Sequence, residues 1–246
     1  MKVLGIDIGG SGIKGAPVDT DSGDMLDSRF RLPTPSPAKP RLVAEIVEEI
    51  ADHFNWEGQL GIGFPGVVRK GTTWTAANIH DDWVGLNAAK YIKKKTGRKT
   101  CIINDADAAG LAEMAFGVGK NRQGVVLLVT IGTGLGIALF TDGCLLPNCE
   151  MGHIEMNGVD AEFYASDAAR KRENLSWKKW GQRFNEYLHT MERLLWPDLV
   201  ILGGGVSKKF DLYKKYITVQ AEVVPAEMLN EAGIIGAAVG ACRYGK

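Results

Sequence analysis

The sequence predicts an α/β fold, and a duplicated motif within it indicates two related halves. Apolar runs typical of buried strands, such as residues 60–64, alternate with stretches of helical periodicity, such as residues 41–55. The segments LGIDIGGSGIKGAPVD and LLVTIGTGLGIALFTD share one order of strand, glycine turn, strand and acidic turn. A length of 246 residues suits one large domain or two small ones.

Prolines and turn residues mark where several of the predicted elements end. Pro17 and the Asp-Ser-Gly turn at 21–23 favour strand, turn and strand over residues 16–32. Four prolines in residues 32–40 predict an extended surface connection. We expect a mostly helical region between the glycines at 203–205 and the last helix. Strands are expected at 2–8, 60–64, 100–103, 125–131, 137–140 and 198–202, and helices at 41–55, 86–96, 106–116, much of 161–195 and 233–242.

Composition excludes several classes of protein. Lysine plus arginine equals aspartate plus glutamate at 29 each, which gives no reason to expect binding to nucleic acid or to a membrane. No apolar run approaches the roughly 20 residues of a membrane span, and Asp7 interrupts any N-terminal signal core. Four cysteines at irregular spacings predict free thiols and a cytoplasmic location.

The first glycine segment, GSGIKG at residues 10–15, matches G-x-G-x-x-G. A dinucleotide site would need a helix to open here, and Pro17 with the turn at 21–23 argues against that helix. A hairpin turn with exposed backbone N–H groups can still hold phosphate, although a plain turn is an equal alternative. Asp7, placed directly before this loop, could hold hydrated magnesium. Lys14 could neutralise phosphate, or it could simply be solvated.

Two further segments carry chemistry. Asn104-Asp105 ends a strand, where α/β folds collect ligand residues, and an aspartate there could accept the proton of a sugar hydroxyl. The alternative is that Asp105 caps the following helix. Glu150-Met-Gly-His153 combines groups that suit sugar hydroxyls. Cys144 and Cys149 lie close enough to this pair to suggest zinc, but no second cysteine pair follows, so no zinc is expected.

Taken in order, these elements resemble the ROK family of sugar kinases, and within it the polyphosphate-using glucokinases. The matching motifs are IDIGGSGIKG at 6–15, GIGFPGVV at 61–68, NDADAAGLAE at 104–113, VTIGTGLGIAL at 129–139, EMGH at 150–153 and ILGGGVSKK at 201–209. The resemblance implies an actin-like (ribonuclease H-like) fold with a cleft between two α/β domains. The expected domains are residues 1–105, joined by a returning helix at about 233–246, and residues 106–232.

The resemblance also implies a division of labour among residues. It implies Asp105 as the general base toward the 6-hydroxyl of glucose, with phosphoryl transfer from polyphosphate, and possibly also ATP. The residues expected to bind the sugar are Gly66, Asn78, Asn104, Asp105, Glu150, His153 and Glu162. Those expected to bind the phosphoryl donor are Asp7, Gly9, Gly10, Ser11, Gly12, Lys14, Gly132, Thr133, Gly134, Gly203, Gly204, Gly205 and Lys208, with magnesium held by Asp7 through water.

The sequence departs from many family members after His153. Most of them carry a cysteine-rich zinc motif there, whereas this chain has only residues 154–162, so we expect no structural zinc. The match of Glu162 rests on the following Tyr-Ala-Ser. A homodimer is expected from the resemblance alone. An ATP-dependent hexokinase of glucose or another hexose, or a non-catalytic sugar-sensing protein, remains the alternative.

Overall fold

The computed structural model describes residues 1–245, which form two compact units. One unit comprises Met1–Phe116 together with the chain from Glu231 onward, and the other comprises Gly117–Asn230. Both are built from helices packed on mixed sheets, so the predicted α/β class is confirmed. The predicted boundary at residue 105 falls one helix too early, because the helix Asp105–Phe116 packs against the C-terminal helix of the first unit.

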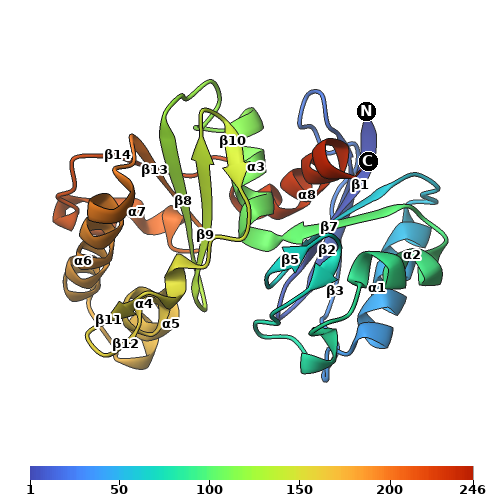
Figure 1. Cartoon of the computed structure of the whole chain (residues 1–246), viewed down its shortest axis with the longest axis horizontal. Coiled ribbons are helices and arrows are strands. Elements are labelled where there is room, and N and C mark those ends of the chain that lie inside the picture. Colours follow the sequence, from blue (N-terminus) through green and yellow to red (C-terminus); the bar gives the residue numbers. More distant parts are fainter. Residues whose placement is uncertain (246) are drawn as a thin grey trace. The chain divides into compact units, whose positions relative to one another are not determined.

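The first unit contains a five-stranded sheet with the strand order β3-β2-β1-β4-β7 (Figure 1). β2 runs antiparallel to its neighbours β1 and β3, whereas β4 and β7 are parallel to β1. The elements are β1 (Lys2–Ile8), β2 (Ile13–Asp19), β3 (Phe30–Leu32), α1 (Pro40–His53), β4 (Leu60–Phe64), β5 (Val68–Arg69), β6 (Thr72–Thr73), η1 (Asp81–Trp83), α2 (Ala88–Thr96), β7 (Thr100–Asn104), α3 (Asp105–Phe116) and α8 (Ala232–Tyr244).

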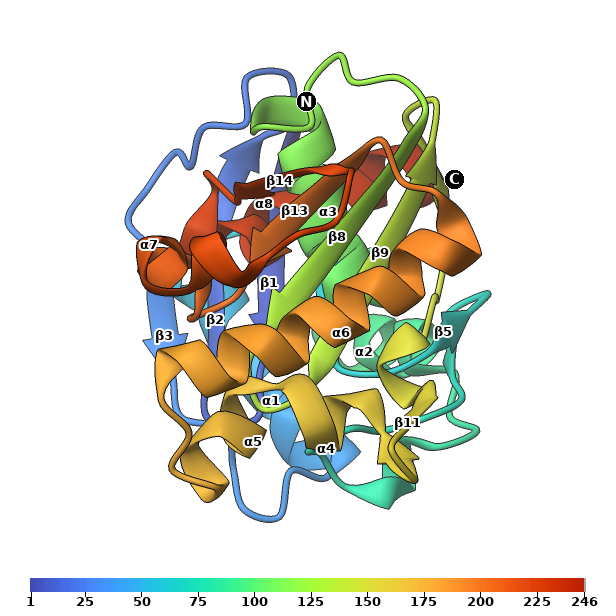
Figure 2. The same cartoon turned by 90° about the vertical axis from the view of Figure 1, so that its left-hand side faces the viewer.

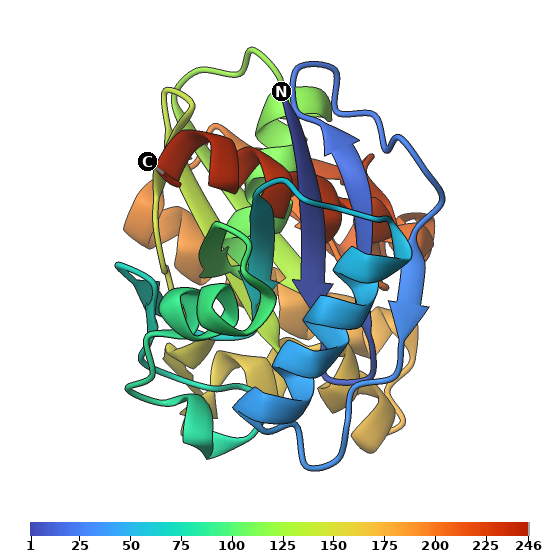
Figure 3. The ribbon, with the colours of Figure 1, turned by 90° about the vertical axis from the view of Figure 1, so that its right-hand side faces the viewer.

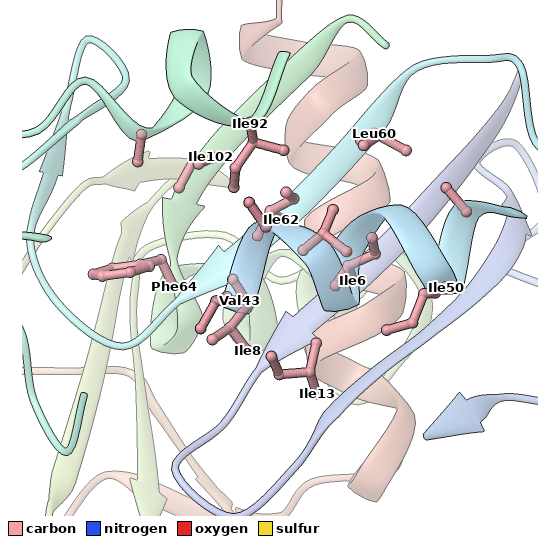
Figure 4. Packing of buried hydrophobic residues seen from close by; sticks show 14 of the residues in the cluster. Ile6, Ile8, Ile13, Val43, Ile50, Leu60, Ile62, Phe64, Ile92 and Ile102 are labelled. Atoms are coloured by element: carbon pink, nitrogen blue, oxygen red, sulfur yellow. The ribbon is translucent and has the colours of Figure 1, made fainter. Parts of the chain in front are cut away.

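One face of this sheet carries the apolar core of the unit. Because successive strand residues point to opposite faces, Leu4, Ile6 and Ile8 of β1 lie on the same side. They are fully buried together with Val43 and Ile50 of α1. Figure 4 shows this cluster from close by, and Figure 3 shows α1 and α2 lying over the sheet. The alternation in β1 therefore leaves Gly5 and Asp7 to face the other side.

The other face is held by close backbone packing of α8. A methyl group added at Gly5 of β1 would lie 2.1 Å from the carbonyl oxygen of Ile234, and one added at Gly61 of β4 would lie 2.1 Å from that of Ala237. Within α8, a methyl group at Gly236 would lie 1.5 Å from the carbonyl oxygen of Ala108 in α3. Glycine is the one residue that permits such approaches. The small-residue C-terminal segment thus serves to seat α8 on the sheet and on α3.

The second unit repeats the sheet of the first. Its strand order is β10-β9-β8-β13-β14, with antiparallel β8, β9 and β10 and with β13 and β14 parallel. The elements are β8 (Val125–Ile131), β9 (Leu135–Thr141), β10 (Cys144–Leu146), η2 (Met151–His153), β11 (Glu155–Met156), β12 (Val159–Asp160), α4 (Ala161–Ala165), α5 (Asp167–Arg172), α6 (Trp177–Leu195), β13 (Leu199–Gly203), η3 (Ser207–Lys209), α7 (Phe210–Tyr213), η4 (Lys214–Tyr216), β14 (Glu222–Pro225) and η5 (Leu229–Glu231).

An amphipathic helix covers this second sheet. Figure 2 shows α6 running across β8 and β9. Its Trp180, Phe184 and Tyr187 are fully buried against apolar side chains that include Val129 of β8 and Leu202 of β13. The ring of Trp180 also donates through Nε1 to the carbonyl oxygen of Ala165, at 2.9 Å. One helix thereby fixes both the sheet and the end of α4, which lies beside the candidate site described below.

The duplication is confirmed strand for strand, because each sheet has the same order and the same pattern of parallel and antiparallel neighbours. The first glycine segment lies in the turn between β1 and β2, where no helix opens, so the dinucleotide interpretation is excluded. The mostly helical region expected after residue 205 was only partly correct. It holds short helices and then β14, a four-residue strand that ends at Pro225.

Two expectations from composition concern the whole chain. All four cysteines are free thiols in the structure. Within residues 1–245, no helix combines the length and the apolar character that crossing a bilayer requires.

We predict that Gly61→Ala destabilises the protein, because the added methyl group collides with the backbone of α8 rather than with a side chain that could rotate away. Overpacking of this kind costs about 1–3 kcal/mol in the free energy of unfolding. Gly63→Ala is the matched control, since its methyl group, in the same strand, would meet the Cβ of Ala108 at an ordinary 3.6 Å. Urea denaturation of both variants checks this, and equal stabilities would contradict the close packing of α8.

Candidate functional site

The glycine turn between β1 and β2 exposes backbone at the end of a buried strand. The N–H of Gly9 donates to the carbonyl oxygen of Gly12 at 3.1 Å, which closes the turn. The guanidinium of Arg31 lies against it and donates to the carbonyl oxygen of Ser11 at 2.9 Å. A turn with exposed N–H groups and a neighbouring cation suits an anion such as phosphate. Arg31 was missed by the sequence analysis, because only strand pairing brings it to this turn.

Asp7 and Lys14 form an ion pair at the base of this turn. They stand directly opposite each other in the antiparallel pairing of β1 with β2, and Lys14 Nζ lies 3.0 Å from Asp7 Oδ2. The carboxylate also faces the start of α8, where a methyl group at Gly233 would lie 2.6 Å from Asp7 Oδ2. The cost of burying Asp7 is therefore offset by a protein cation. From the sequence, Asp7 is expected at magnesium and Lys14 at phosphate, whereas in the structure the two residues pair with each other.

Asn104 and Asp105, at the junction of β7 and α3, make different hydrogen bonds. Asn104 Oδ1 accepts from the N–H of Asp107 at 2.9 Å, and its Nδ2 donates to the carbonyl oxygen of Gly66 at 3.2 Å. Asn104 thus provides the N-terminal cap and ties the loop after β4 to the helix. Asp105 is the first residue of α3, is half-buried, and accepts from the N–H of Ala106 through Oδ1 at 2.8 Å. The cap that could have explained Asp105 is therefore supplied by its neighbour.

Asn78 lies beside the first glycine turn. A methyl group at Gly10 would be 3.4 Å from the Cβ of Asn78, and Asn78 itself has a left-handed backbone with a φ of 58°. Asparagine tolerates that conformation better than most residues. The first unit therefore brings Asn78 close to Gly10, and Asn104 close to Gly66, as separate pairs.

The glycine turn between β8 and β9 has a carboxylate packed directly on it. The N–H of Gly132 donates to the carbonyl oxygen of Gly134 at 3.1 Å, as in the first turn, and Thr133 is exposed between them. A methyl group at Gly134 would lie 2.2 Å from Glu162 Oε2. Glu162, in α4, consequently contacts the turn that the sequence assigns to phosphate.

Near Glu162, the second unit also holds a group of polar side chains around His153. His153 Nδ1 lies 2.9 Å from Asp160 Oδ2, and His153 Nε2 lies 3.8 Å from Glu150 Oε2. One ligand atom from each of His153, Asp160 and Glu162 falls within 4.8 Å of the others. Gly152 permits this arrangement, because a methyl group there would lie 2.4 Å from the carbonyl oxygen of Leu135. The predicted set of Glu150, His153 and Glu162 is thus brought together, and Asp160 is an unpredicted member.

The electrostatics of this group follow from its composition. The hydrogen bond with Asp160 raises the pKa of His153 above the ordinary imidazole value, and the charges of Glu162 and Glu150 act in the same direction. Partial burial raises the pKa of Glu150; His153 opposes that shift and Glu162 adds to it. A protonated imidazole between carboxylates can donate to a polyhydroxyl ligand, while the carboxylates accept from it.

Gly203–Gly205 lie next to the glycine turn at residues 132–134 of the second unit. Gly204 has a φ of 77°, and a methyl group there would lie 2.4 Å from the carbonyl oxygen of Ile131, the residue just before Gly132. The turn is closed by Ser207, whose Oγ donates to the carbonyl oxygen of Gly204 at 2.8 Å. Lys208 is exposed beside it. The two predicted donor segments of this unit are therefore neighbours.

Comparisons with known proteins agree with one another. The model of the ROK family matches residues 3–169. Polyphosphate glucokinase of Mycobacterium tuberculosis (strain CDC 1551 / Oshkosh) is 45% identical over 96% of this chain and 89% of its own length. The crystal structure of inorganic polyphosphate/ATP-glucomannokinase from Arthrobacter sp. strain KM is 42% identical, with a TM-score of 0.94 over 98% of each chain. A ROK family glucokinase from Streptomyces griseus, 24% identical, supports the fold, with a TM-score of 0.82 over 97% of this chain and 98% of its own.

We predict that His153 titrates above the ordinary imidazole pKa of about 6.5 and that Asp160→Asn lowers its pKa, because the largest cause of the shift is the Asp160 carboxylate. The sign follows from a raised folded-state pKa. The pair contributes to stability below the unfolded-state value and loses that contribution as the pH rises through the folded-state value. NMR titration of the His153 imidazole in wild type and in the variant checks this. An unchanged His153 pKa in the variant would contradict the assignment.

Proposed function

The chain belongs to the ROK family, and we propose that it is an enzyme that transfers a phosphoryl group from inorganic polyphosphate to the 6-hydroxyl of glucose. The product is glucose 6-phosphate. Support comes from the near-full-length likeness to polyphosphate glucokinases. ATP is the second donor that we propose, because the Arthrobacter relative is named a polyphosphate/ATP-glucomannokinase.

The single observation that carries this proposal is the contact between Glu162 and Gly134. It places a carboxylate from a group suited to sugar hydroxyls directly on a glycine turn suited to phosphate. A kinase needs two such surfaces in contact, because the phosphoryl group passes from the donor to a hydroxyl of the acceptor. A protein that only senses sugar would have no need of the phosphate-type turn beside it.

In the proposed site, the sugar is bound by amide, imidazole and carboxylate groups. Glu150, His153 and Glu162 of the second unit converge, and Asn104 of the first unit is fixed by its bonds to α3 and to Gly66. Carboxylates accept from hydroxyl groups, whereas a protonated imidazole and an amide NH₂ donate to them. Asn78 and Gly66 of the first unit are further sugar-binding residues that we propose from the family resemblance.

We assign to Asp105 the role of general base. As the 6-oxygen attacks the terminal phosphorus, Asp105 takes the hydroxyl proton, and the bond from that phosphorus to the bridging oxygen breaks. The shortened polyphosphate leaves with that oxygen. Two features support this role: Asn104 provides the bond to Asp107 that caps α3, and the N-terminal end of a helix favours a charged carboxylate. Most of the remaining catalysis is positioning and stabilisation of charge.

The proposed donor site uses backbone N–H groups and cations. In the first unit, the turn at Gly9–Gly12 offers N–H groups and Arg31 offers positive charge. In the second unit, Gly132–Gly134 and Gly203–Gly205 offer N–H groups and Lys208 offers positive charge. Magnesium, when bound with the donor, would neutralise charge on the phosphate oxygens. A single carboxylate beside a phosphate turn is the donor set that magnesium commonly uses. Asp7 fits this role through a bridging water, because Lys14 already contacts its Oδ2.

Location and assembly belong to the proposal as well. The four free thiols support a cytoplasmic location, where cysteines stay reduced. A homodimer is the assembly that we propose from the family resemblance.

We predict that Asp105→Asn lowers kcat for glucose 6-phosphate formation by about 100-fold to 10,000-fold, which is the usual contribution of a general base. Glucose binding, measured by calorimetry, should change little, because the amide keeps the size and polarity of the carboxylate. Asp24→Asn, in an exposed turn, serves as the matched control. Near-normal turnover of the Asp105 variant would remove this residue from the mechanism, and a wild-type protein that forms no product would refute the proposed function.

A further inference from the structure

A tight hairpin returns the chain from His153 to Asp160. β11 and β12 pair antiparallel, with Glu155 opposite Asp160, and the turn between them is Asn157-Gly158. Both turn residues have positive φ, 54° and 79°, as the two-residue turns of twisted hairpins require. The N–H of Ala161 donates to the carbonyl oxygen of Ile154 at 2.8 Å and closes the unit. The backbone alone therefore fixes Asp160 beside His153.

The carboxylate of Asp160 does not cap the helix that it precedes. Asp160 occupies the N-cap position of α4, where an aspartate normally accepts from a backbone N–H of the first helical turn. Its side chain makes no such bond, whereas the caps of the next two helices do: Ser166 accepts from Ala169, and Ser176 accepts from Lys179. Asp160 instead contacts His153 Nδ1 at 2.9 Å. The choice of partner points to a use for the imidazole rather than for the helix.

The pair is too exposed to be explained by stability of the fold. The side chains of His153 and Asp160 are 57% and 41% exposed, and exposed ion pairs contribute little to stability. The contact instead fixes the tautomer and the orientation of the His153 ring. An ionised carboxylate can only accept, so Nδ1 carries a proton and Nε2 is left to face Glu150 and any ligand bound between them.

We propose that Asp160 is a positioning residue for sugar binding, which acts through Nδ1 of His153 and holds Nε2 toward a sugar hydroxyl. This inference rests on the proposed function of the same site. The groups that face His153 are Asp160 of the hairpin, Glu150 before η2 and Glu162 of α4. Asp160 contacts Nδ1, whereas Glu150 lies on the Nε2 side of the ring. Asp160 therefore orients the imidazole, and Glu150 and Glu162 line the site.

The test compares Asp160→Ala, Asp160→Asn and the control Asp211→Asn, which removes an exposed charge paired with Lys214 elsewhere in the second unit. We expect Asp160→Ala to raise the KM for glucose about 10-fold, as loss of an orienting partner does elsewhere, with kcat changed less than about 2-fold. Asp160→Asn should be intermediate, because its amide oxygen can still accept from Nδ1. The control should match wild type.

A spectroscopic readout separates positioning from a merely structural role. In wild type, ¹⁵N NMR of neutral His153 should show the proton on Nδ1, and in Asp160→Ala it should show both tautomers in exchange, at an unchanged melting temperature. An unchanged KM and tautomer in Asp160→Ala, with an active wild type, would overturn the role of Asp160 alone.

Two other results would have different meanings. A wild type that neither binds glucose nor forms product would refute the proposed function, and with it this role. The ligand atoms of His153, Asp160 and Glu162 are also close enough to hold a cation. A divalent ion bound one per chain in wild type and lost in Asp160→Ala, by elemental analysis, would overturn positioning in favour of metal ligation.

Discussion

The close backbone contact between α8 and the first sheet is the constraint on which the site of the first unit depends. Gly5 and Gly61 leave no side chain between the strands and the helix, so the carbonyl groups of α8 come within van der Waals reach of β1 and β4. The same helix crosses α3 at Gly236. Asp7 faces the start of α8, and Asp105 opens α3, so one packed helix sets the positions of both carboxylates. Glycines that have no side chain of their own thereby help to position the two carboxylates to which we assign roles.

Duplication explains the architecture, and divergence of the two copies explains the division of roles. Each unit has a hairpin with a glycine turn and two further parallel strands in the same order. In the first unit, the last of these strands, β7, leads into Asn104 and Asp105, which carry the proposed base. In the second unit, an insertion after β10 supplies η2, the β11–β12 hairpin and α4, and with them the proposed sugar-binding groups. A glycine turn closed by a backbone hydrogen bond is common to both units.

The elements that could be predicted from the sequence are those marked by neighbouring residues, such as apolar runs and prolines. Strands such as β4 and β8 were visible as apolar runs, and Pro17 was enough to replace a dinucleotide helix by a hairpin. β14 was not visible, because four residues ending at Pro225 carry too little periodicity. Asp160 and Arg31 were missed for a different reason: each matters through a partner that only the hairpin or strand pairing brings near. The pairing of Asp7 with Lys14 likewise required the register of β1 and β2, although both residues were singled out.

One assay tests whether polyphosphate is the phosphoryl donor and glucose the acceptor. Purified protein, glucose and magnesium would be incubated with polyphosphate or with ATP at matched terminal phosphate, and glucose 6-phosphate would be measured over time. We expect turnover with polyphosphate, and we expect excess chelator to abolish it. Product from ATP alone would contradict the donor assignment, and no product from either donor would contradict the account of the chain as a sugar kinase.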